Sequence, residues 1–544
     1  MKSRTSFFNS TVLKKDITRF APVWGLYSVY LLLVFVAFSS YSGYSAARDL
    51  LDLCTGSAII QMIYGVICAA VLFGDLFNSR MCNALHAMPL RREGWCLNRL
   101  TAGLLFFLVP TGLFSLAMLA LVSQYWYVPL IFLGVNLLCF LFFFCTGALC
   151  SLLAGNRLGM LVLYAILQFF SVFIYSMVTV FYEPFLYGVP VDMDEVLRFS
   201  PIMMLSECEY LDLTKGGGIY EIYWEELRYL GITGLLGLLS CWPAVLLYRR
   251  RKLEAAGDFL AFTWVKPVFL GVYCLSVGML LYALGESFDT GVDVIFLLAG
   301  LAVGFFTGRM LLQRKVRVFQ PKAVGTFLLV LAGLGISVGV VAWDLLGIVR
   351  RVPEVQQVEK VEISSGYDYH PLVLEENADL ERIIAIHETC LEDREFDYGE
   401  ATSLLLTYQL KNGKRLTRAY SVRIDSDQGR YLEEKLSNWQ CIFGTDDMES
   451  IKSRLQYVMY EGEPISAKLN SGLLEAIRQD CEVGAMAQDY RFHQEDDSWT
   501  WVELILVGED GREEYLSIRI FSSCVDTVAF IEENDLHPEI YKYS

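Results

Sequence analysis

Hydrophobic residues in the first 350 positions gather in long runs, and short polar segments separate one run from the next. A helix of about 20 apolar residues is long enough to cross the roughly 30 Å of hydrocarbon in a bilayer. Nine runs meet or approach this length, and this pattern predicts a polytopic α-helical membrane protein. We place the nine spans near 21–40, 55–75, 100–122, 127–153, 158–182, 227–248, 267–285, 292–312 and 324–346.

After residue 352 the long runs stop and short stretches of alternating apolar and polar residues take their place. The alternation at 403–410 is typical of a half-buried strand, and Asn412-Gly413 is a strong signal for a hairpin turn. A second hairpin is expected at 501–520, with Gly511 in its turn 98 residues after Gly413. We therefore expect a soluble α+β domain at 352–544 in which one unit occurs twice.

Each of the two modules, 352–445 and 446–544, is expected to pack helices against a small antiparallel sheet. In both modules one helix precedes the hairpin and another follows it. The four expected helices are at 380–386, 431–439, 473–481 and 525–533.

Composition agrees with a membrane part and a separate soluble part. Hydrophobic residues make up 54% of the chain, charged residues only 19%, and the mean hydropathy is +0.41, which excludes a large soluble enzyme. The net charge of −17 is uneven, because residues 1–351 carry 26 basic and 21 acidic side chains, whereas residues 352–544 carry 18 and 40. The acidic domain would repel phosphates, so we expect no nucleic-acid partner.

Basic residues select an orientation for the expected spans. Lysines and arginines concentrate before span one and in the loops between spans two and three, six and seven, and eight and nine, which predicts that these segments are cytoplasmic. Nine crossings then leave the C-terminal domain outside the cell, and only Arg350 and Arg351 argue mildly against this. Residues 1–20 are expected to form an amphipathic helix in the cytoplasmic interface.

The segment between spans two and three carries the strongest functional signal. It is expected to form a short helix that stops at Pro89 and is followed by Arg91 and Arg92. Leu76, Phe77, Met81 and Leu85 fall near one helical face by their spacing, and such a face in the cytoplasm suits docking on a partner. The alternative is an ordinary loop that positive charge retains inside. The expected partner-binding residues are Leu76, Phe77, Arg80, Met81, Leu85 and Arg91.

The order of these features resembles the membrane subunits of bacterial ABC exporters of the ABC-2 type. The short helix ends in HAMPLRRE, residues 198–207 read RFSPIMMLSE, like a partly re-entrant element of that family, and 248–262 read YRRRKLEAAGDFLAF. The resemblance covers roughly the first half of the chain and rests on loose patterns. It implies a six-span permease core at 21–250, in which the short helix couples to an ABC ATPase.

The same resemblance implies a bacterial cell-membrane protein that acts as a homodimer or with a sister permease. ATP and magnesium would be bound by the separate ATPase. Residues 352–544 resemble the uncharacterised C-terminal domain attached to some Firmicutes ABC permeases.

Three spans at 251–348 exceed the six-span plan. Gly300, Gly304 and Gly308 share a face of span eight, and Gly335 and Gly339 lie in span nine. Glycine lets membrane helices approach closely, so these faces are expected to pack the additional spans on the core or on one another. The charged residues near the membrane lie by expected span ends where water can solvate them, which disfavours a proton-coupled or ion-coupled transporter. They are Asp75, Glu183, Asp293 and Asp344.

No catalytic, cofactor or metal site is expected in this chain. It lacks the G-x-x-x-x-G-K-[ST] phosphate loop, and His370, His387, His493 and His537 lack metal-ligand spacing. A packing role is expected for His387, and the acidic runs at 392–397 and 495–497 are expected to be solvated surface. Free thiols are favoured over two disulfides for the four cysteines of the C-terminal domain, Cys390, Cys441, Cys481 and Cys524.

The sequence therefore predicts the permease subunit of an ATP-driven exporter of a hydrophobic or amphipathic compound: a peptide antibiotic, a drug or a lipid-linked precursor. One alternative is a non-transporting sensor complex in which the outside domain binds an extracellular ligand. Another is a membrane scaffold with no ATPase.

Overall fold

The computed structural model describes residues 9–41, 43–87, 91–190, 199–213, 219–288, 293–366, 368, 370–392, 401–445, 447–460, 463–488, 498–507, 513–534 and 541–542. Pro89, His493, Gly511 and His537, and the acidic residues 393–397 and 495–497, lie outside these residues. The chain divides into two compact units. The first comprises Met1–Phe181 and Asp192–Ile336, and the second comprises Tyr182–Val191 and Ser337–Ser544.

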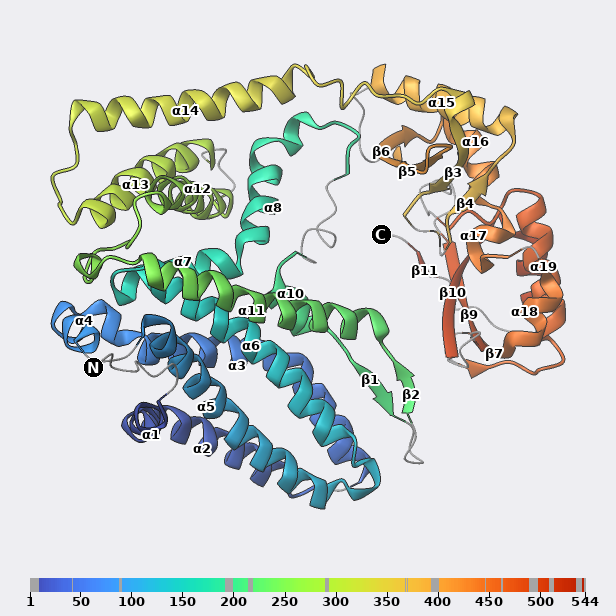
Figure 1. The fold of residues 1–544 in the computed structure, drawn as a ribbon. Coiled ribbons are helices and arrows are strands. Elements are labelled where there is room, and N and C mark those ends of the chain that lie inside the picture. The colour runs from blue at the N-terminus through green and yellow to red at the C-terminus, as the bar shows by residue number, and fades with distance from the viewer. Residues whose placement is uncertain are drawn as a thin grey trace. The chain divides into compact units, whose positions relative to one another are not determined.

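Eight helices among the described residues are long and apolar enough to cross a membrane, and a bent pair of shorter helices makes a ninth candidate span (Figure 1). The chain is therefore a multi-pass helical membrane protein, as its hydrophobic pattern predicts. The eight helices are α2 Ala21–Phe38, α3 Tyr44–Leu72, α5 Arg92–Leu121, α6 Val128–Leu153, α11 Trp224–Arg250, α12 Val265–Glu286, α13 Asp293–Gln313 and α14 Pro321–Ala342.

The expected span at 158–182 is broken into two helices. They are α7 Arg157–Gln168 and α8 Phe170–Phe181, which meet at an angle of 65°. At the break, the carbonyl oxygen of Gln168 accepts a 3.4 Å hydrogen bond from the hydroxyl of Ser200. A side chain that satisfies a freed carbonyl makes such a break tolerable in an apolar setting.

Short elements join the long helices of the first unit. The expected amphipathic helix is present as α1, which Asn9 caps by accepting from the amide of Thr11 at 3.0 Å. The segment expected to be re-entrant forms α10, whose Ile202 and Leu205 are buried. The short elements are α1 Ser10–Arg19, η1 Gly74–Phe77, α4 Ser79–His86, η2 Ser123–Tyr125, α10 Pro201–Glu207, β1 Leu211–Leu213, β2 Ile219–Ile222 and η4 Leu253–Ala255.

Helix α6 is the central helix of the first unit, and glycines let its neighbours approach it. A Cβ atom built on Gly65 of α3 would lie 2.9 Å from the backbone nitrogen of Phe144 in α6. One built on Gly237 of α11 would lie 2.4 Å from the Cα of Phe142. Real Cβ atoms do not approach backbone this closely, so both contacts require glycine.

Helices α12 and α13 form a tight pair (Figure 1), and the glycines predicted to pack span eight lie between them. A Cβ on Gly300 would lie 2.8 Å from the Cα of Gly278, and one on Gly304 would lie 2.8 Å from the carbonyl oxygen of Cys274. Gly308 faces the side chains of Leu270 and Tyr273. This face of α13 therefore lies against α12.

For α14 the same packing stays a prediction. Among the described residues, none lies within 4 Å of a Cβ built on Gly335, and Gly339 meets only Trp343, four residues further along the chain. No residue in the most apolar stretch of α14 is buried by the described part of the chain. A small-xxx-small pattern creates room for a neighbouring helix without supplying one.

The second unit contains two antiparallel sheets with the same strand order. The first has the order β4-β3-β5-β6 and the second β8-β7-β9-β10, with β11 also paired to β9. Both expected hairpins are present. The strands are β3 Val358–Ser364, β4 Leu372–Leu374, β5 Ala401–Leu410, β6 Arg415–Arg423, β7 Leu455–Tyr460, β8 Glu463–Pro464, β9 Ser498–Val507, β10 Glu513–Phe521 and β11 Tyr541–Lys542.

The helices also recur in corresponding positions: α15 lies between β4 and β5, α19 between β8 and β9, and another helix follows each hairpin. This shared order agrees with two related modules, although their origin from one duplicated unit stays a prediction. The helices are α15 Asn377–Glu392, α16 Asp427–Leu436, α17 Trp439–Phe443, α18 Met448–Arg454, α19 Asn470–Glu482 and α20 Val525–Glu533, with the short turns η3 Glu183–Phe185 and η5 Val355–Gln357.

Each sheet has its own hydrophobic core, and the boundary between the cores differs from the expected one at 445. Trp439, Ile442 and Phe443 of α17 belong to the second core, whereas Ala487 packs in the first. The four cysteines of this unit are buried and carry free thiols. His387 is buried and its Nδ1 lies 3.2 Å from the hydroxyl of Tyr408, which confirms its packing role.

A segment from between two membrane helices also belongs to the second unit. Gly188 accepts a 3.0 Å hydrogen bond from the amide of Ala419 in β6, and the rings of Tyr187 and Tyr420 lie 5.6 Å apart. The expected boundary at 352 therefore misses residues 182–190, which directly follow α8 in the chain.

Candidate functional site

The segment predicted to couple to a partner is two short elements rather than one helix. The chain leaves α3 through the 3-10 turn η1, becomes extended at Asn78, and then forms α4. The side chain of Asn78 accepts a 3.0 Å hydrogen bond from the amide of Arg80 at the start of α4. The extended residue breaks the i, i+4 spacing that predicted a continuous face.

This break sorts the predicted partner-binding residues into different environments. Leu76 is fully buried and Phe77 is partly buried against the core of the first unit, so the prediction of one exposed face is wrong for them. Arg80 and Met81 on α4, and Arg91 beyond it, are exposed. The side chain of Leu85 lies outside the described residues.

A buried arginine of α5 holds η1 from one side. Nη2 of Arg99 lies 2.7 Å from Oδ2 of Asp75 in η1, and its Nη1 lies 3.0 Å from Oδ1 of Asp16 in α1. The side chain of Arg99 is only 3% exposed. The partly exposed Arg19 adds a second contact to Asp75, at 3.4 Å. One guanidinium therefore connects α1, η1 and α5, and Asp75 is not a solvated residue at a span end as expected.

Aromatic rings complete the surroundings of this cation. The guanidinium of Arg99 lies 5.0 Å from the ring centroid of Trp95 and 5.7 Å from that of Phe20, within the range of cation–π attraction. Burial raises the pKa of the Asp16 carboxyl, and the nearby charge of Arg99 opposes that rise. A buried cation between two carboxylates is costly to disturb, because removal of one partner leaves a buried charge without compensation.

A second buried arginine holds η1 from the other side. Arg251, directly after α11, donates hydrogen bonds to the carbonyl oxygens of Ser151 at 3.0 Å, Leu152 at 2.7 Å and Leu76 at 3.2 Å. The first two carbonyls belong to the last turn of α6, where backbone acceptors lack partners within the helix and a cation is favourable. Burial lowers the pKa of Arg251 to about 10, so its guanidinium stays charged at neutral pH.

The stretch after Arg251 continues this connection. The amide of Gly257 donates to the carbonyl of Gly155 at 2.7 Å, and the amide of Ala261 donates to that of Leu153 at 2.8 Å. A Cβ on Gly155 would lie 2.3 Å from two backbone carbonyl oxygens of this stretch, so glycine is required there. The EAAGDFLAF motif thus packs against the turn between α6 and α7, which was not expected from the sequence.

The basic cluster at the start of α5 also contacts the end of α11. Nη1 of Arg92 donates to the carbonyl oxygens of Arg249 at 3.2 Å and Arg251 at 3.3 Å, and Arg249 pairs with Glu93 at 2.8 Å. We name the group Asp16, Asp75, Arg92, Arg99 and Arg251 the arginine clamp. It joins α1, η1, α5, α6 and α11 at one end of the helix bundle.

The contacts of the arginine clamp are ion pairs and hydrogen bonds between elements that lie far apart in the sequence. Within the described ranges, no group of three or more His, Cys, Asp or Glu side chains could hold a metal ion. Hydropathy reasoning missed Arg99 and Arg251 because both look like ordinary basic residues at the end of a span. A signal was present in Asp75, an acidic residue that directly follows the apolar run of the second span and stands among apolar neighbours.

No family model, curated protein or solved structure matches the chain.

Proposed function

We propose that this chain is the membrane subunit of an ATP-driven exporter of the ABC-2 type, and that α4 couples it to a separate ATPase. The observation that supports this most is the joint attachment of η1 to Arg99 and Arg251, with Arg80 and Met81 exposed on the α4 that follows. A coupling element needs an outer face for the partner and a stiff connection to several spans, and this one has both.

The arginine clamp explains how movement of α4 would reach the spans. Pressure on α4 acts on η1, which is bonded to the start of α5 and, through Arg251, to the end of α6 and the residue after α11. Packed helices shift as rigid bodies because close-packed interiors transmit strain. ATP binding and hydrolysis in the partner would then rearrange the spans around a hydrophobic or amphipathic substrate, in a homodimer or with a sister permease in a bacterial cell membrane.

Co-purification from native membranes tests this function. We expect the wild-type chain to recover an ABC ATPase, and we expect an Arg80→Glu, Met81→Asp double variant to lose it. Both changes lie on exposed side chains, so the fold should survive. Arg317→Glu, an exposed residue between α13 and α14, is the matched control and should retain the ATPase. Recovery of no ATPase by the wild type would overturn the proposal.

A sensor complex is the second candidate, and the attachment of residues 182–190 to the C-terminal α+β unit favours it. Tyr182 follows the last residue of α8, and its hydroxyl lies 3.1 Å from that of Ser337 in the C-terminal half of α14. A ligand that changes the α+β unit could therefore pull on two membrane helices without crossing the bilayer. Substrate transport in vesicles that contain the purified chain and its ATPase separates the candidates, because a sensor would hydrolyse ATP without transport.

A further inference from the structure

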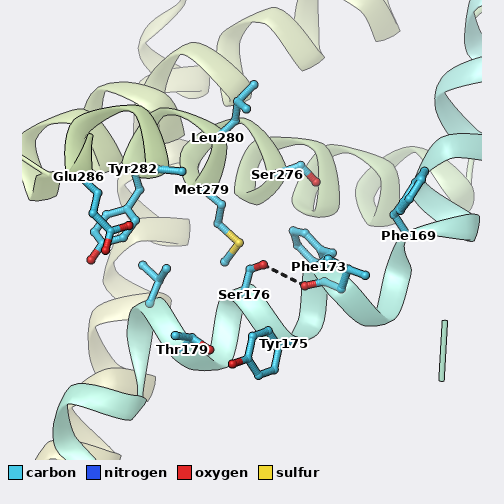
Figure 2. Close-up of a pocket in the computed structure, with 13 residues that line it drawn as sticks. Phe169, Phe173, Tyr175, Ser176, Thr179, Ser276, Met279, Leu280, Tyr282 and Glu286 are labelled. Atoms are coloured by element: carbon cyan, nitrogen blue, oxygen red, sulfur yellow. Dashed lines mark hydrogen bonds between the residues drawn. The ribbon is translucent and has the colours of Figure 1, made fainter. Parts of the chain in front are cut away.

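A cavity of about 640 Å³ lies in the first unit between the second half of the broken span and the first additional span. Its walls are α8, with Phe169 just before it, and α12 (Figure 2). The residues recur every three or four positions on both helices, so one face of each helix forms a wall. The volume falls in the range of small-molecule sites, which are mostly apolar with few polar groups.

The interior of this cavity, which we name the α8–α12 groove, is apolar with hydroxyl groups at intervals. Met279 extends from α12 toward α8, and Phe173 and Ser176 extend from α8 toward α12 (Figure 2). The hydroxyl of Ser176 donates a 2.9 Å hydrogen bond to the carbonyl oxygen of Val172. The buried Oγ1 of Thr179 has no hydrogen-bond partner among the described residues.

Charge in the α8–α12 groove is confined to one end and has one sign. Glu286, in the last turn of α12, is the sole charged side chain among the described residues that line the groove, and Tyr282 stands beside it (Figure 2). Asp293, the first residue of α13, adds a second carboxylate nearby, since a Cβ on Gly285 would lie 2.9 Å from its Cα. The end of an apolar groove is therefore acidic.

We propose that the α8–α12 groove binds a cationic amphiphile, with its apolar body between Phe173 and Met279 and its ammonium group at Glu286. A membrane phospholipid fits less well, because its phosphate would meet carboxylates and no basic side chain among the described lining residues. Attraction between the ammonium and a carboxylate at the edge of an apolar medium is stronger than in water. The inference names the substrate class of the proposed exporter and rests on that function for transport, although not for binding.

Photolabelling of the purified full chain in phosphatidylcholine nanodiscs tests the groove directly. The probe is dodecylamine that carries a diazirine in its chain, and a matched dodecanol diazirine reports uncharged partition into the membrane. We expect the amine to label residues 169–180 and 276–286 at probe concentrations about five- to tenfold lower than the alcohol requires. This ratio corresponds to roughly 1 kcal/mol of ionic attraction. Equal labelling by both probes would overturn the proposal.

Charge variants separate the role of Glu286 from general stability. Glu286→Gln should move labelling by the amine most of the way to the level of the alcohol, because of the two carboxylates only Asp293 remains, and Glu286→Lys should favour a dodecyl sulfate diazirine instead. Glu225→Gln is the matched control, because Glu225 is an exposed carboxylate at the start of α11, outside the groove. Persistence of amine labelling in Glu286→Lys would overturn the assignment of the cation site. Full competition by unlabelled phosphatidylethanolamine would assign the groove to lipid and also overturn it.

The labelling needs no ATPase, so its outcome is independent of the exporter function. Labelling of the groove without recovery of an ATPase would retain the binding site and overturn the exporter. Recovery of an ATPase without labelling of the groove would retain the exporter and overturn the binding site. Met279→Trp, which fills the middle of the groove, should reduce labelling by both probes, and unchanged labelling in a monodisperse sample of this variant would contradict the location.

Discussion

The guanidinium of Arg251 donates a 3.2 Å hydrogen bond to the carbonyl oxygen of Leu76, a residue 175 positions earlier in the chain. This bond joins the residue after α11 to the turn before α4. Arg99 holds the adjacent residue, Asp75, so two buried cations fix neighbouring positions of one 3-10 turn. A short helix that must transmit force gains its stiffness from such contacts, because its own few backbone hydrogen bonds provide little.

Replacement of Arg251 by methionine should destabilise the chain. Methionine retains most of the packing volume but removes the three hydrogen bonds that the guanidinium donates. The carbonyls of Ser151, Leu152 and Leu76 then lack this partner. Hydrogen bonds to charged groups contribute about 1.5–3 kcal/mol each, and we expect a loss of about 3 kcal/mol in the free energy of unfolding in detergent. The exposed neighbour Arg250 provides the control, since Arg250→Met should change it by less than about 0.5 kcal/mol.

Charge removal at Arg99 should show that the cluster acts as a unit. Arg99→Met leaves the carboxylates of Asp16 and Asp75 buried without their shared cation and should cost about 3–5 kcal/mol. The triple variant Asp16→Asn, Asp75→Asn, Arg99→Met has no buried charge at this position and should recover most of that loss. Unfolding free energies of the single and triple variants measure the coupling. A triple variant less stable than Arg99→Met would contradict a compensated charge cluster.

Glycines at two positions with the same sequence pattern should respond differently to leucine. Gly304→Leu forces side-chain atoms against the backbone of Cys274 and should cost about 1–3 kcal/mol by overpacking α12 and α13. Gly335→Leu in α14 meets no described atom within 4 Å of its Cβ and should cost less than about 0.5 kcal/mol. Thermal unfolding of both variants in the same detergent compares them, and an equal loss would show that α14 packs as tightly as α13.

Local sequence patterns predicted the helices and strands of this chain well where all residues of an element share one kind of environment, such as hydrocarbon or a half-buried sheet. Eight spans follow from long apolar runs, because hydrocarbon accepts little else. Both hairpins of the C-terminal domain follow from alternation and from turn residues such as Gly413, whose φ of 78° suits glycine. Helices α3 and α5 begin earlier than the expected spans. In α5 the buried partners of Arg99 let this charged residue lie within the helix.

Tertiary contacts between distant residues could not be predicted from one sequence. The break at Phe169 depends on a hydroxyl from Ser200, and the burial of Leu76 depends on an extended residue at Asn78. The arginine clamp needs residues 16, 75, 99 and 251 in one place, and no spacing rule connects them. In the sequence Glu286 is likewise only a charged residue at the end of a span. The structure places it at the end of a groove whose opposite wall is α8.

The C-terminal domain should lose stability in mildly acidic solution through His387. Burial, and then the charge of Arg418, lower the pKa of this histidine from 6.5 to about 4. In the unfolded chain His387 is protonated as the pH falls through about 6.5, whereas in the folded chain it stays neutral until about pH 4. The contribution of His387 to stability is therefore fully present above pH 6.5 and is lost as the pH falls toward 4. The loss can reach roughly 3 kcal/mol.

Amide hydrogen exchange in β5 of the intact protein, corrected for intrinsic rates, measures this effect. Other carboxylates titrate in the same range, so the informative quantity is the difference between wild type and His387→Gln. The variant should be less stable at pH 7 and should lose less on acidification. Equal pH slopes in the two proteins would contradict the assignment to His387.

Attachment of residues 182–190 to β6 should depend on the absence of a side chain at Gly188. Its φ is 73°, and a Cβ there would lie 2.1 Å from Cε1 of Tyr420. Asparagine tolerates this backbone conformation, so Gly188→Asn isolates the steric conflict and should release the segment. Gly413→Asn is the control, because Gly413 has a φ of 78° and no described atom within 4 Å of its Cβ.

We expect chymotrypsin to cleave after Tyr187 about tenfold faster in Gly188→Asn than in the wild type, and at the wild-type rate in Gly413→Asn. A tenfold change corresponds to local opening that is easier by roughly 1.4 kcal/mol. Equal cleavage in all three proteins would show that this contact does not hold the segment, and the connection from the α+β unit to α8 would then lose its support.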